Sequence, residues 1–352
     1  MRILIVAGGT GGHILPAVTL SQEILSRGMG RVLFVASSKK RDRVLLADKG
    51  IDFKIVPVGP LKSRGILAAL DFTIRLFAGT IISAFILLRY RPRVVIGFGG
   101  YVSGPIVLLA SLFGIRTIIH EQNVYPGKAN RILARFVDKV AVSFDETKNY
   151  LKEFESKIIV SGNPIRKALK RDGRKDAGPG FTLLVIGGSQ GAHRLNELVP
   201  KAMGLMSKDK RSELSVIHIS GEEDMAAVAG KYKEMGVDSR VFSFTEDMAA
   251  IYNKCDFVIG RAGAMMVSEL IELAIPSILI PYPHAGGHQL ANARVLGDKR
   301  GAIVLKEEGL DETVLKDALL SMMDSNALED MALKIKGIKR FDACGVLIKS
   351  IS

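Results

Sequence analysis

Two segments of the chain, residues 2–13 and 182–193, follow the same local plan. Each has a run of aliphatic residues, then a glycine-rich turn, then the start of a helix: Arg2-Ile-Leu-Ile-Val-Ala-Gly-Gly-Thr-Gly-Gly-His13 and Thr182-Leu-Leu-Val-Ile-Gly-Gly-Ser-Gln-Gly-Ala-His193. A buried strand, a tight turn and a helix begin a doubly wound parallel sheet, which binds ligands at the carboxyl ends of its strands. The repeat therefore predicts an α/β protein with two similar units, each with its own ligand crevice.

Neither glycine-rich turn matches a common nucleotide-binding loop. No Gly-Lys-Ser/Thr follows either turn, so neither is a Walker loop. Ile14 stands where the last glycine of Gly-x-Gly-x-x-Gly would fall in the first turn. Both an NTPase and an NAD-dependent enzyme are therefore disfavoured.

Length and composition favour a two-domain protein of a reducing compartment. A chain of 352 residues is long enough to form two hydrophobic cores. Two cysteines, Cys255 and Cys344, cannot form a disulfide framework. The first apolar run is too short for a signal peptide and passes straight into a turn, so we expect it to be the first strand. The chain has no Trp and only 6% aromatic residues, which argues against a nucleic-acid platform.

The net charge of +13 is unevenly distributed along the chain. Residues 1–162 hold 23 Lys and Arg against 11 Asp and Glu, a balance of +12, whereas residues 163–352 hold 26 against 25, a balance of +1. Such asymmetry indicates an acidic partner for the first half, either nucleic acid or anionic lipid.

Residues 66–88 form the most apolar stretch and favour lipid as that partner. Apolar residues recur in it at helical spacing, and Leu76 to Leu88 carries no charge. A membrane span needs about 20 residues, so we expect a helix too short to span. Two readings remain open, a buried helix of the α/β layer and a helix with a lipid-facing side. The flanking basic residues that support the second reading are Lys62, Arg64, Arg75, Arg89, Arg91 and Arg93.

Three glycine-rich or polar loops of the first half, residues 8–13, 97–105 and 120–127, each follow an aliphatic run. Because parallel strands end at one edge of a sheet, we expect these loops to converge on one crevice. His13 opens a helix, where the positive end of the helix dipole should lower its pKa and keep it able to accept a proton. A structural, hydrogen-bonded His13 is the alternative.

Residues 255–292 predict a strand, a small-residue turn, a helix, a second strand and a loop. The strands are expected at 256–259 and 277–280, and the helix at Met265 to Ala274. A helix that begins at such a turn presents free N–H groups and a partial positive charge, which suits a diphosphate. Glu269 lies about one turn into the helix, where its carboxylate could accept hydrogen bonds from two ribose hydroxyls. An ordinary parallel-sheet unit with a solvated Glu269 is the alternative.

These motifs resemble, in order and over essentially the whole chain, those of the MurG family of bacterial N-acetylglucosaminyltransferases. The resemblance is carried by residues 8–13, 99–105, 120–123, 162–166 and 187–192 and by the site that begins at Gly260. It implies the GT-B fold, two Rossmann-like doubly wound parallel-sheet domains separated by a cleft. Residues 1–162 would bind the acceptor and the membrane, joined by a C-terminal helix at about 337–352, and residues 163–336 would bind the donor.

The resemblance further implies transfer of GlcNAc from UDP-GlcNAc to the 4-hydroxyl of MurNAc in the undecaprenyl-linked acceptor lipid I, which gives lipid II. The protein would then lie peripherally at the cytoplasmic face of the bacterial inner membrane, on an anionic surface, without nucleic acid and without a cofactor. Oligomeric state stays open. The implied donor-binding residues are Thr10, Gly11, Gly12, Asn123, Arg166, Ser189, Thr245, Ala264, Met265, Met266, Val267, Ser268, Glu269 and Gln289, with Gly263 and Asn292 also matching the motif; the implied acceptor-binding residues are Tyr101, Ser103 and Gly104.

The implied chemistry is inverting, because the family makes a β linkage from an α donor. In-line attack needs one general base, for which His13 is the first candidate and Glu121 the second, either directly or by orienting His13. No two Asp residues are two apart, so we expect no metal site. The leaving diphosphate would instead meet Arg166, loop N–H groups and the helix that begins near Ala264.

Three other functions compete with this interpretation. A nucleotide-sugar 2-epimerase shares the architecture but has no need of a basic, apolar first domain. A non-catalytic membrane scaffold would bind the nucleotide sugar without using the acceptor motifs. A nucleic-acid-binding protein would explain the charge alone, and its binding would depend steeply on salt.

Overall fold

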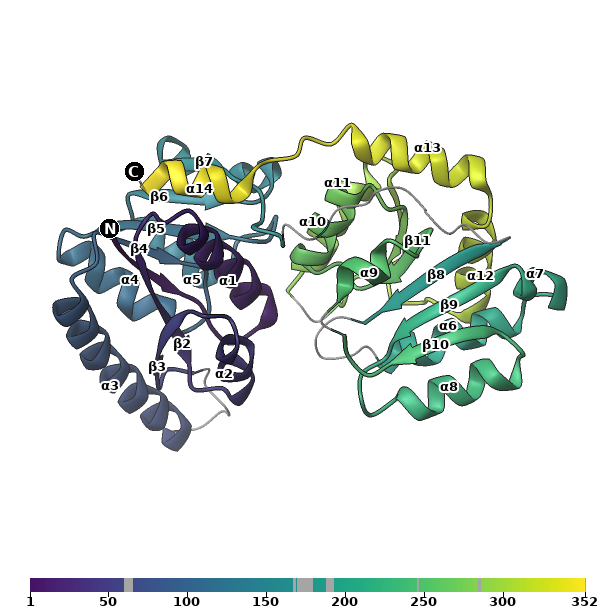
Figure 1. Ribbon diagram of the computed structural model, residues 1–352, viewed down its shortest axis with the longest axis horizontal. Coiled ribbons are helices and arrows are strands. Elements are labelled where there is room, and N and C mark those ends of the chain that lie inside the picture. Colours follow the sequence, from purple (N-terminus) through teal and green to yellow (C-terminus); the bar gives the residue numbers. More distant parts are fainter. Residues whose placement is uncertain are drawn as a thin grey trace. The chain divides into compact units, whose positions relative to one another are not determined.

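The computed structural model describes residues 1–59, 66–166, 169, 180–187, 193–245, 247–283 and 286–351. The chain folds into two compact units, one of Met1–Ile165 with Phe341–Ser352 and one of Arg166–Arg340 (Figure 1). The chain thus enters the second unit three residues later than expected from the sequence, at Arg166, and leaves it after Arg340.

The first unit is built on a seven-stranded sheet with the order β3-β2-β1-β4-β5-β6-β7. All of its pairs are parallel, as predicted. Because the chain steps outward from β1 to β3 and then returns to β4, the order reverses between β1 and β4. The strands are β1 (Arg2–Val6), β2 (Arg31–Ser37), β3 (Asp52–Val56), β4 (Val94–Gly97), β5 (Arg116–Glu121), β6 (Lys139–Val142) and β7 (Ile158–Val160).

Alternating side chains of β1 supply two separate cores. Ile3 and Ile5 pack with helices on one face, and Leu4 and Val6 with helices on the other, because successive strand residues point to opposite faces. All four are fully buried, and each such side chain contributes about 1.5–3 kcal/mol. The helices of this unit are α1 (Gly11–Ser26), α2 (Lys40–Ala47), α3 (Ile66–Tyr90), α4 (Ser103–Leu112), α5 (Lys128–Leu133) and α14 (Ala343–Ile351), with 3-10 turns η1 (Asp145–Tyr150) and η2 (Lys152–Lys157).

Helix α3 is longer than the apolar run predicted, and one side of it faces solvent. By length and composition alone it could cross a membrane, so the expectation that it is too short is wrong. It continues through Asp71 and Arg75, which interrupt the apolar pattern, and through Arg89, which was expected to flank it. Its inner side packs on the sheet through Leu87, with Leu76, Ile82, Ile86 and Tyr90 partly buried. Since α3 connects β3 to β4 within one sheet, it serves as a crossover helix of the α/β layer.

The C-terminal helix begins later than expected. Residues 325–336 form a separate helix of the second unit, and α14 starts only at Ala343. Cys344, Leu347, Ile348 and Ile351 of α14 join the core of the first unit on the α1 side (Figure 1). The predicted start, at about residue 337, therefore lies six residues before the observed one, and residues 337–342 connect α13 to α14.

The second unit is built on a six-stranded parallel sheet with the order β10-β9-β8-β11-β12-β13, which reverses between β8 and β11. One of its cores joins Leu183 and Val185 of β8 to helices α6, α8 and α12. The strands are β8 (Phe181–Ile186), β9 (Leu214–Ile219), β10 (Asp238–Phe242), β11 (Phe257–Gly260), β12 (Ser277–Leu279) and β13 (Ala302–Val304). The helices are α6 (His193–Gly204), α7 (Lys208–Ser212), α8 (Met225–Glu234), α9 (Met248–Tyr252), α10 (Ala264–Leu273), α11 (His288–Gly297), α12 (Glu312–Met322) and α13 (Ser325–Lys336).

Candidate functional site

In both sheets, predicted loops begin at the points where the strand order reverses, and the third loop of the first unit follows the neighbouring strand β5. In the first sheet, residues 8–12 follow β1 and residues 98–102 follow β4. In the second sheet, residue 187 follows β8 and residues 261–263 follow β11. Doubly wound sheets bind ligands at these positions, so each unit carries one candidate site.

His13 lies in the first turn of α1, where its ring is held through one nitrogen. Nδ1 lies 3.3 Å from Gly8 O and 3.2 Å from the Thr10 hydroxyl. A carbonyl can only accept, so we assign the hydrogen to Nδ1, which leaves Nε2 able to accept a proton. Burial lowers the pKa of His13, and the nearby carboxylates of Glu121 and Asp42 oppose that shift. The direction is as predicted from the sequence, but burial rather than the helix dipole is the main cause.

The two glycine turns of the first unit touch one another, and only glycine fits there. Gly99 has φ +98°, and a Cβ on it would lie 3.2 Å from Nε2 of His13. Gly100 has φ +81°, and a Cβ on it would lie 2.2 Å from Gly8 O. Backbone therefore approaches both the turn and the imidazole closely, and the expected convergence of these two loops is confirmed.

The third loop is organised by the buried carboxylate of Glu121. Oε1 accepts from the backbone N–H and the side-chain amide of Asn123, at 2.9 and 3.2 Å. Oε2 accepts from Gly127 N at 2.9 Å and from the Asn130 amide at 2.8 Å. Four donors satisfy a carboxylate that is only 2% exposed. This arrangement suits a charge that holds the loop better than a group that collects a proton from a ligand.

The other predicted residues of the first unit differ in how far they are exposed. Tyr101, Thr10 and Gly12 are exposed, Gly104 and Asn123 are half-buried, and Gly11 is buried. Ser103 is fully buried, and its hydroxyl donates to Gly99 O at 2.7 Å and to Val6 O at 3.2 Å. The Ser103 side chain therefore shapes the turn, so the predicted acceptor contact of this residue would have to involve its backbone.

Sequence reasoning missed Asp42 in the first turn of α2. The residue is 1% exposed, and its Oδ2 accepts from Gly9 N at 3.0 Å and from the Ser37 hydroxyl. Lys39 Nζ donates to Gly9 O at 2.8 Å. Asp42 thus holds in place the turn that precedes His13. An acid in a helical first turn is common, so the sequence alone offered no sign of this role.

The candidate donor residues of the second unit gather around the start of α10. Gly263 is its N-cap, and Ala264 begins the helix directly after the turn that follows β11. Met266 and Val267 are buried, so only their backbone can meet a ligand, whereas Met265 and Ser268 are half-buried. The strand and helix boundaries lie within one residue of those predicted.

Glu269, one turn into α10, is anchored by a residue that we did not predict. The Tyr252 hydroxyl donates to Glu269 Oε2 at 2.9 Å. Burial raises the pKa of Glu269 to about 6, while the Tyr252 hydrogen bond and the charge of Arg166 act in the opposite direction. Arg166, whose positive charge lowers this pKa, is exposed. Tyr252 resembled an ordinary core residue in the sequence.

The remaining donor candidates lie on loops of the second unit. Gln289, in the first turn of α11, accepts through Oε1 from Tyr282 N at 2.9 Å. Thr245 accepts through its hydroxyl from Asp247 N at 3.2 Å. Asn292 is buried and donates to Ala262 O at 3.1 Å. Ser189 lies outside the described residues.

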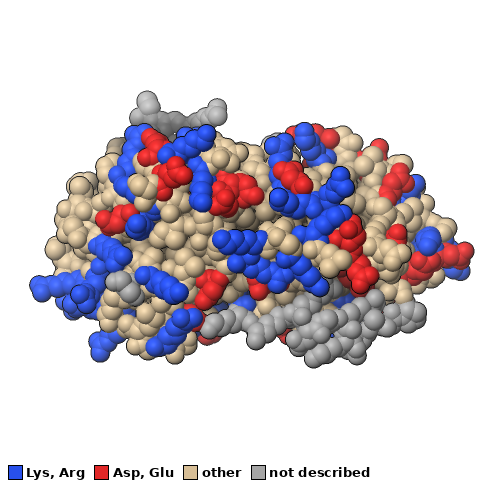
Figure 2. Space-filling model, turned by 90° about the horizontal axis from the view of Figure 1, so that it is seen from above, with Lys and Arg blue, Asp and Glu red and all other residues tan. Residues whose placement is uncertain are grey.

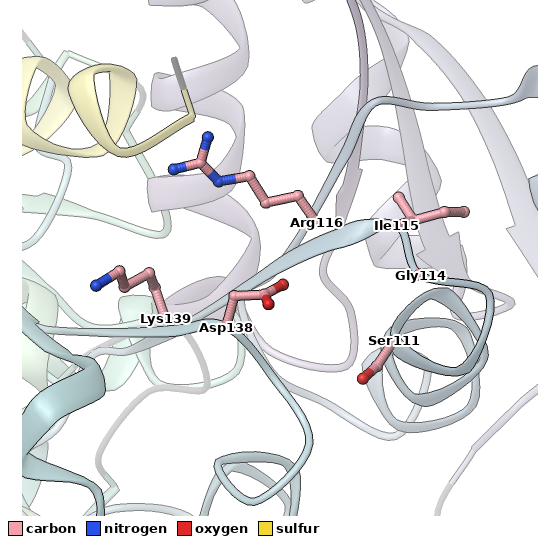
Figure 3. A pocket seen from close by; sticks show the side chains of 6 residues that line it. All are labelled: Ser111, Gly114, Ile115, Arg116, Asp138 and Lys139. Carbon is pink, nitrogen blue, oxygen red and sulfur yellow. The ribbon is translucent and has the colours of Figure 1, made fainter.

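A pocket of about 430 Å³ lies away from these loops, at the opposite edge of the first sheet (Figure 3). Five of its lining residues lie at or just before the start of β5 or β6, and Ser111 lies near the end of α4. The Asp138 carboxylate there already accepts from the backbone and hydroxyl of Thr117. Position and chemistry both separate it from the candidate site. Within the described residues, no group of three or more His, Cys, Asp and Glu side chains could hold a metal ion.

Comparison with known families agrees with this geometry. Residues 3–142 match the glycosyltransferase family 28 N-terminal domain, and residues 182–343 match the glycosyltransferase family 28 C-terminal domain. The first match ends before β7, and the two matches together take in the loops at both reversal points.

Curated relatives match over the full length. The chain is 38% identical over 355 residues to the UDP-N-acetylglucosamine–N-acetylmuramyl-(pentapeptide) pyrophosphoryl-undecaprenol N-acetylglucosamine transferase of Syntrophus aciditrophicus, which covers 99% of this chain and 98% of the relative. The enzyme of the same name from Thermoanaerobacter is 36% identical over 369 residues, covering 100% of both.

Solved structures give the same result. The Acinetobacter baumannii MurG structure superposes with a TM-score of 0.81 at 27% identity, covering 100% of this chain and 99% of that one. A kitacinnamycin glycosyltransferase, at 16% identity and a TM-score of 0.71, shares the fold. The predicted GT-B fold is thereby confirmed. The chain belongs to glycosyltransferase family 28 and, within it, to the MurG transferases.

Proposed function

We propose that this protein transfers GlcNAc from UDP-GlcNAc to the 4-hydroxyl of MurNAc in lipid I, with inversion at the sugar, to give lipid II. The observation that carries the proposal is full-length similarity, at 38% identity, to an enzyme named for this transfer. The loops at both reversal points support it, because the sequence motifs that suggested the reaction lie at the ligand-binding edges of the two sheets.

The second unit binds the donor. The N–H groups at the start of α10 and the charge of Arg166 face the diphosphate. Glu269, held by Tyr252, accepts from the ribose hydroxyls through the oxygen that Tyr252 does not use. Backbone of Ala264 to Val267, together with Ser268, Thr245 and Gln289, completes the contacts.

The first unit binds the acceptor and supplies the base. Nε2 of His13 takes the proton from the attacking hydroxyl, since Nδ1 is committed to Gly8 O. A lowered pKa keeps the imidazole neutral and ready for this step. Glu121 does not itself collect the proton. Its charge stabilises the imidazolium formed during the reaction, while its four donors hold the loop around Asn123.

The leaving UDP gains negative charge as the glycosidic bond breaks. Arg166, the start of α10 and loop N–H groups stabilise that charge. In this scheme the chain's own residues supply the positive charge that the reaction requires.

The membrane contact lies on α3 of the first unit. Exposed apolar side chains repeat along one side of the helix at spacings of three or four residues, which forms a continuous stripe. With the +12 balance of residues 1–162, the stripe suits peripheral binding to the anionic, cytoplasmic face of the inner membrane. On the face shown in Figure 2, by contrast, Asp and Glu side chains lie among the Lys and Arg. The α3 stripe consists of Leu70, Ile74, Phe77, Ile81, Phe85 and Leu88.

Incubation with radiolabelled UDP-GlcNAc and a lipid I analogue tests the reaction. We expect label in a product of the mass of the lipid II analogue, with one UDP released per transfer. Conversion of UDP-GlcNAc without acceptor would instead indicate a nucleotide-sugar 2-epimerase.

A further inference from the structure

Arg261 is a nearly buried guanidinium at the end of β11, in the turn that leads to α10. It is 7% exposed and was not among the donor residues expected from the sequence. Its Nη1 donates to Ile280 O, just after β12, at 3.1 Å and to the carboxylate of Glu307, beyond β13. One side chain therefore joins the carboxyl ends of three neighbouring strands.

The same guanidinium also supports the loop that follows β12. Its central carbon lies 5.3 Å from the centroid of the Tyr282 ring, within the range of a cation–π contact. Tyr282 N in turn donates to Oε1 of Gln289 at 2.9 Å. Contacts thus run from Arg261 through Tyr282 to the amide of Gln289.

The Tyr282 contact determines which way the Gln289 amide faces. A backbone N–H can only donate, so it selects the amide oxygen and turns the NH₂ group to the other side. Any shift of Tyr282 would free the amide to rotate. The position of Tyr282 therefore determines which hydrogen-bond donors Gln289 can offer to a ligand.

Burying a charged side chain carries a desolvation cost that an apolar residue filling the same space would avoid. Arginine differs from leucine or methionine in offering several N–H donors in one rigid plane, which sets the directions of its partners. Here the partners are a strand-end carbonyl, a carboxylate and an aromatic face, all beside the candidate donor site.

We propose that Arg261, held by Glu307, is a positioning residue that fixes the loop after β12 and thereby presents the Gln289 amide to the GlcNAc moiety of the donor. The inference rests on the proposed function, in which Gln289 contacts the donor. It adds Arg261 and Glu307, which do not touch the substrate and which affect binding of the sugar rather than of the nucleotide.

The experiment compares a ligand that carries the sugar, UDP-GlcNAc, with one that ends at the diphosphate, UDP. Calorimetry measures Kd for UDP-GlcNAc and for UDP with wild type, Arg261→Lys, Glu307→Gln and Gln289→Ala, and kinetics gives KM and kcat for each. We expect Arg261→Lys and Glu307→Gln to weaken UDP-GlcNAc binding about tenfold and UDP binding less than about twofold. Glu307→Gln keeps the shape of the side chain, so it carries the test if Arg261→Lys does not fold. Arg240→Lys, an exposed arginine of the same unit, is the matched control and should change neither constant.

A double-mutant cycle then separates positioning from general damage. If Arg261 acts through Gln289, adding Arg261→Lys to Gln289→Ala has no further effect on UDP-GlcNAc affinity. Equal weakening of both ligands, additive effects in the cycle, or an unchanged affinity in Gln289→Ala would each overturn the inference while leaving the transferase activity in place. Failure of wild type to transfer GlcNAc would instead overturn the proposed function.

Discussion

His13 and Glu269 are titratable side chains whose pKa values burial shifts in opposite directions. Burial disfavours a charged form, so it lowers the pKa of the imidazole and raises that of the carboxyl. Each also has one polar atom tied to a neighbour, Nδ1 to Gly8 O and Oε2 to the Tyr252 hydroxyl. The remaining atom of each, Nε2 or Oε1, is the one we assign to the substrate.

His13→Asn should lower kcat by about 10²- to 10⁴-fold, the usual contribution of a general base. Because the pKa of His13 is lowered, its base form persists below the ordinary histidine value of 6.5. The acid limb of the wild-type kcat profile, measured at saturating UDP-GlcNAc so that donor binding does not contribute, should therefore lie below that value and be missing in the variant. A variant that keeps the limb would assign the base to another group.

Glu269→Ala should weaken UDP-GlcNAc binding by about 1.5–3 kcal/mol, the contribution of a hydrogen bond to a charged group, while far-UV CD stays native. In wild type, affinity should fall as pH drops through about 6, where the carboxylate gains a proton. Tyr252→Phe removes a hydrogen bond that lowers this pKa, so the midpoint should move to higher pH. Calorimetry across pH measures all three effects, and a pH-independent affinity in wild type would remove Glu269 from the site.

At the scale of helices and turns, backbone geometry determines the structure of the first unit as much as side chains do. The turns after β1 and β4 approach so closely that a single Cβ would collide with a carbonyl. Helix α3 shows a second element property, since the crossover between β3 and β4 buries one side and leaves the other to solvent.

Gly100→Ala tests the close approach of the turns. Gly100 and Gly114 both have positive φ, at +81° and +68°, but only at Gly100 would a Cβ meet backbone, 2.2 Å from Gly8 O. Gly114→Ala should cost about 1–3 kcal/mol of unfolding free energy for backbone strain alone. Gly100→Ala should cost more and should reduce kcat, because the turn beside His13 must move. Equal losses in chemical denaturation would show that the contact relaxes without cost.

Replacing Phe77, Ile81 and Phe85 together with Ser should weaken binding to anionic vesicles at least about tenfold, because each apolar side chain contributes on the order of 1.5–3 kcal/mol when buried. The three side chains are 69%, 54% and 64% exposed, so the fold should not change. Turnover of a soluble short-chain acceptor should stay intact.

Leu205→Ser with Leu333→Ser, at exposed positions of the second unit, is the matched control for vesicle flotation. Wild-type binding should weaken with salt, since each basic residue near an anionic surface adds about 1 kcal/mol. Equal flotation with neutral and anionic vesicles would contradict the lipid interpretation of the charge asymmetry.

At the scale of the whole molecule, both doubly wound sheets reverse their strand order at the same step, between the first and the fourth strand along the chain. The repeat in sequence is thus a repeat in topology. Acceptor chemistry and the lipid-facing helix belong to the basic first unit in our proposal, and donor chemistry to the nearly neutral second.

Transfer should persist in EDTA, because the chain has no Asp-x-Asp and the proposed positive charge comes from Arg166 and the start of α10. Initial rates with and without chelator measure this directly. Arg166→Ala should slow the reaction under both conditions. Abolition by EDTA with recovery on added Mg²⁺ or Mn²⁺ would defeat the leaving-group argument.

The sequence by itself determined the two parallel sheets, the glycine turns at their reversal points and the family, because strand periodicity and turn chemistry are local and six motifs lie in one order. The start of α14 was expected at about residue 337 but lies at Ala343, because an apolar pattern indicates a helix without setting the residue at which it begins.

Only the tertiary structure decided which side chains the site can use. Ser103, Met266 and Val267 point inward, whereas Tyr252, Arg261 and Asp42 reach functional loops from elements distant in sequence. The exposed side of α3 was likewise decided by packing, because periodicity places residues on a common face but does not say which face the sheet covers.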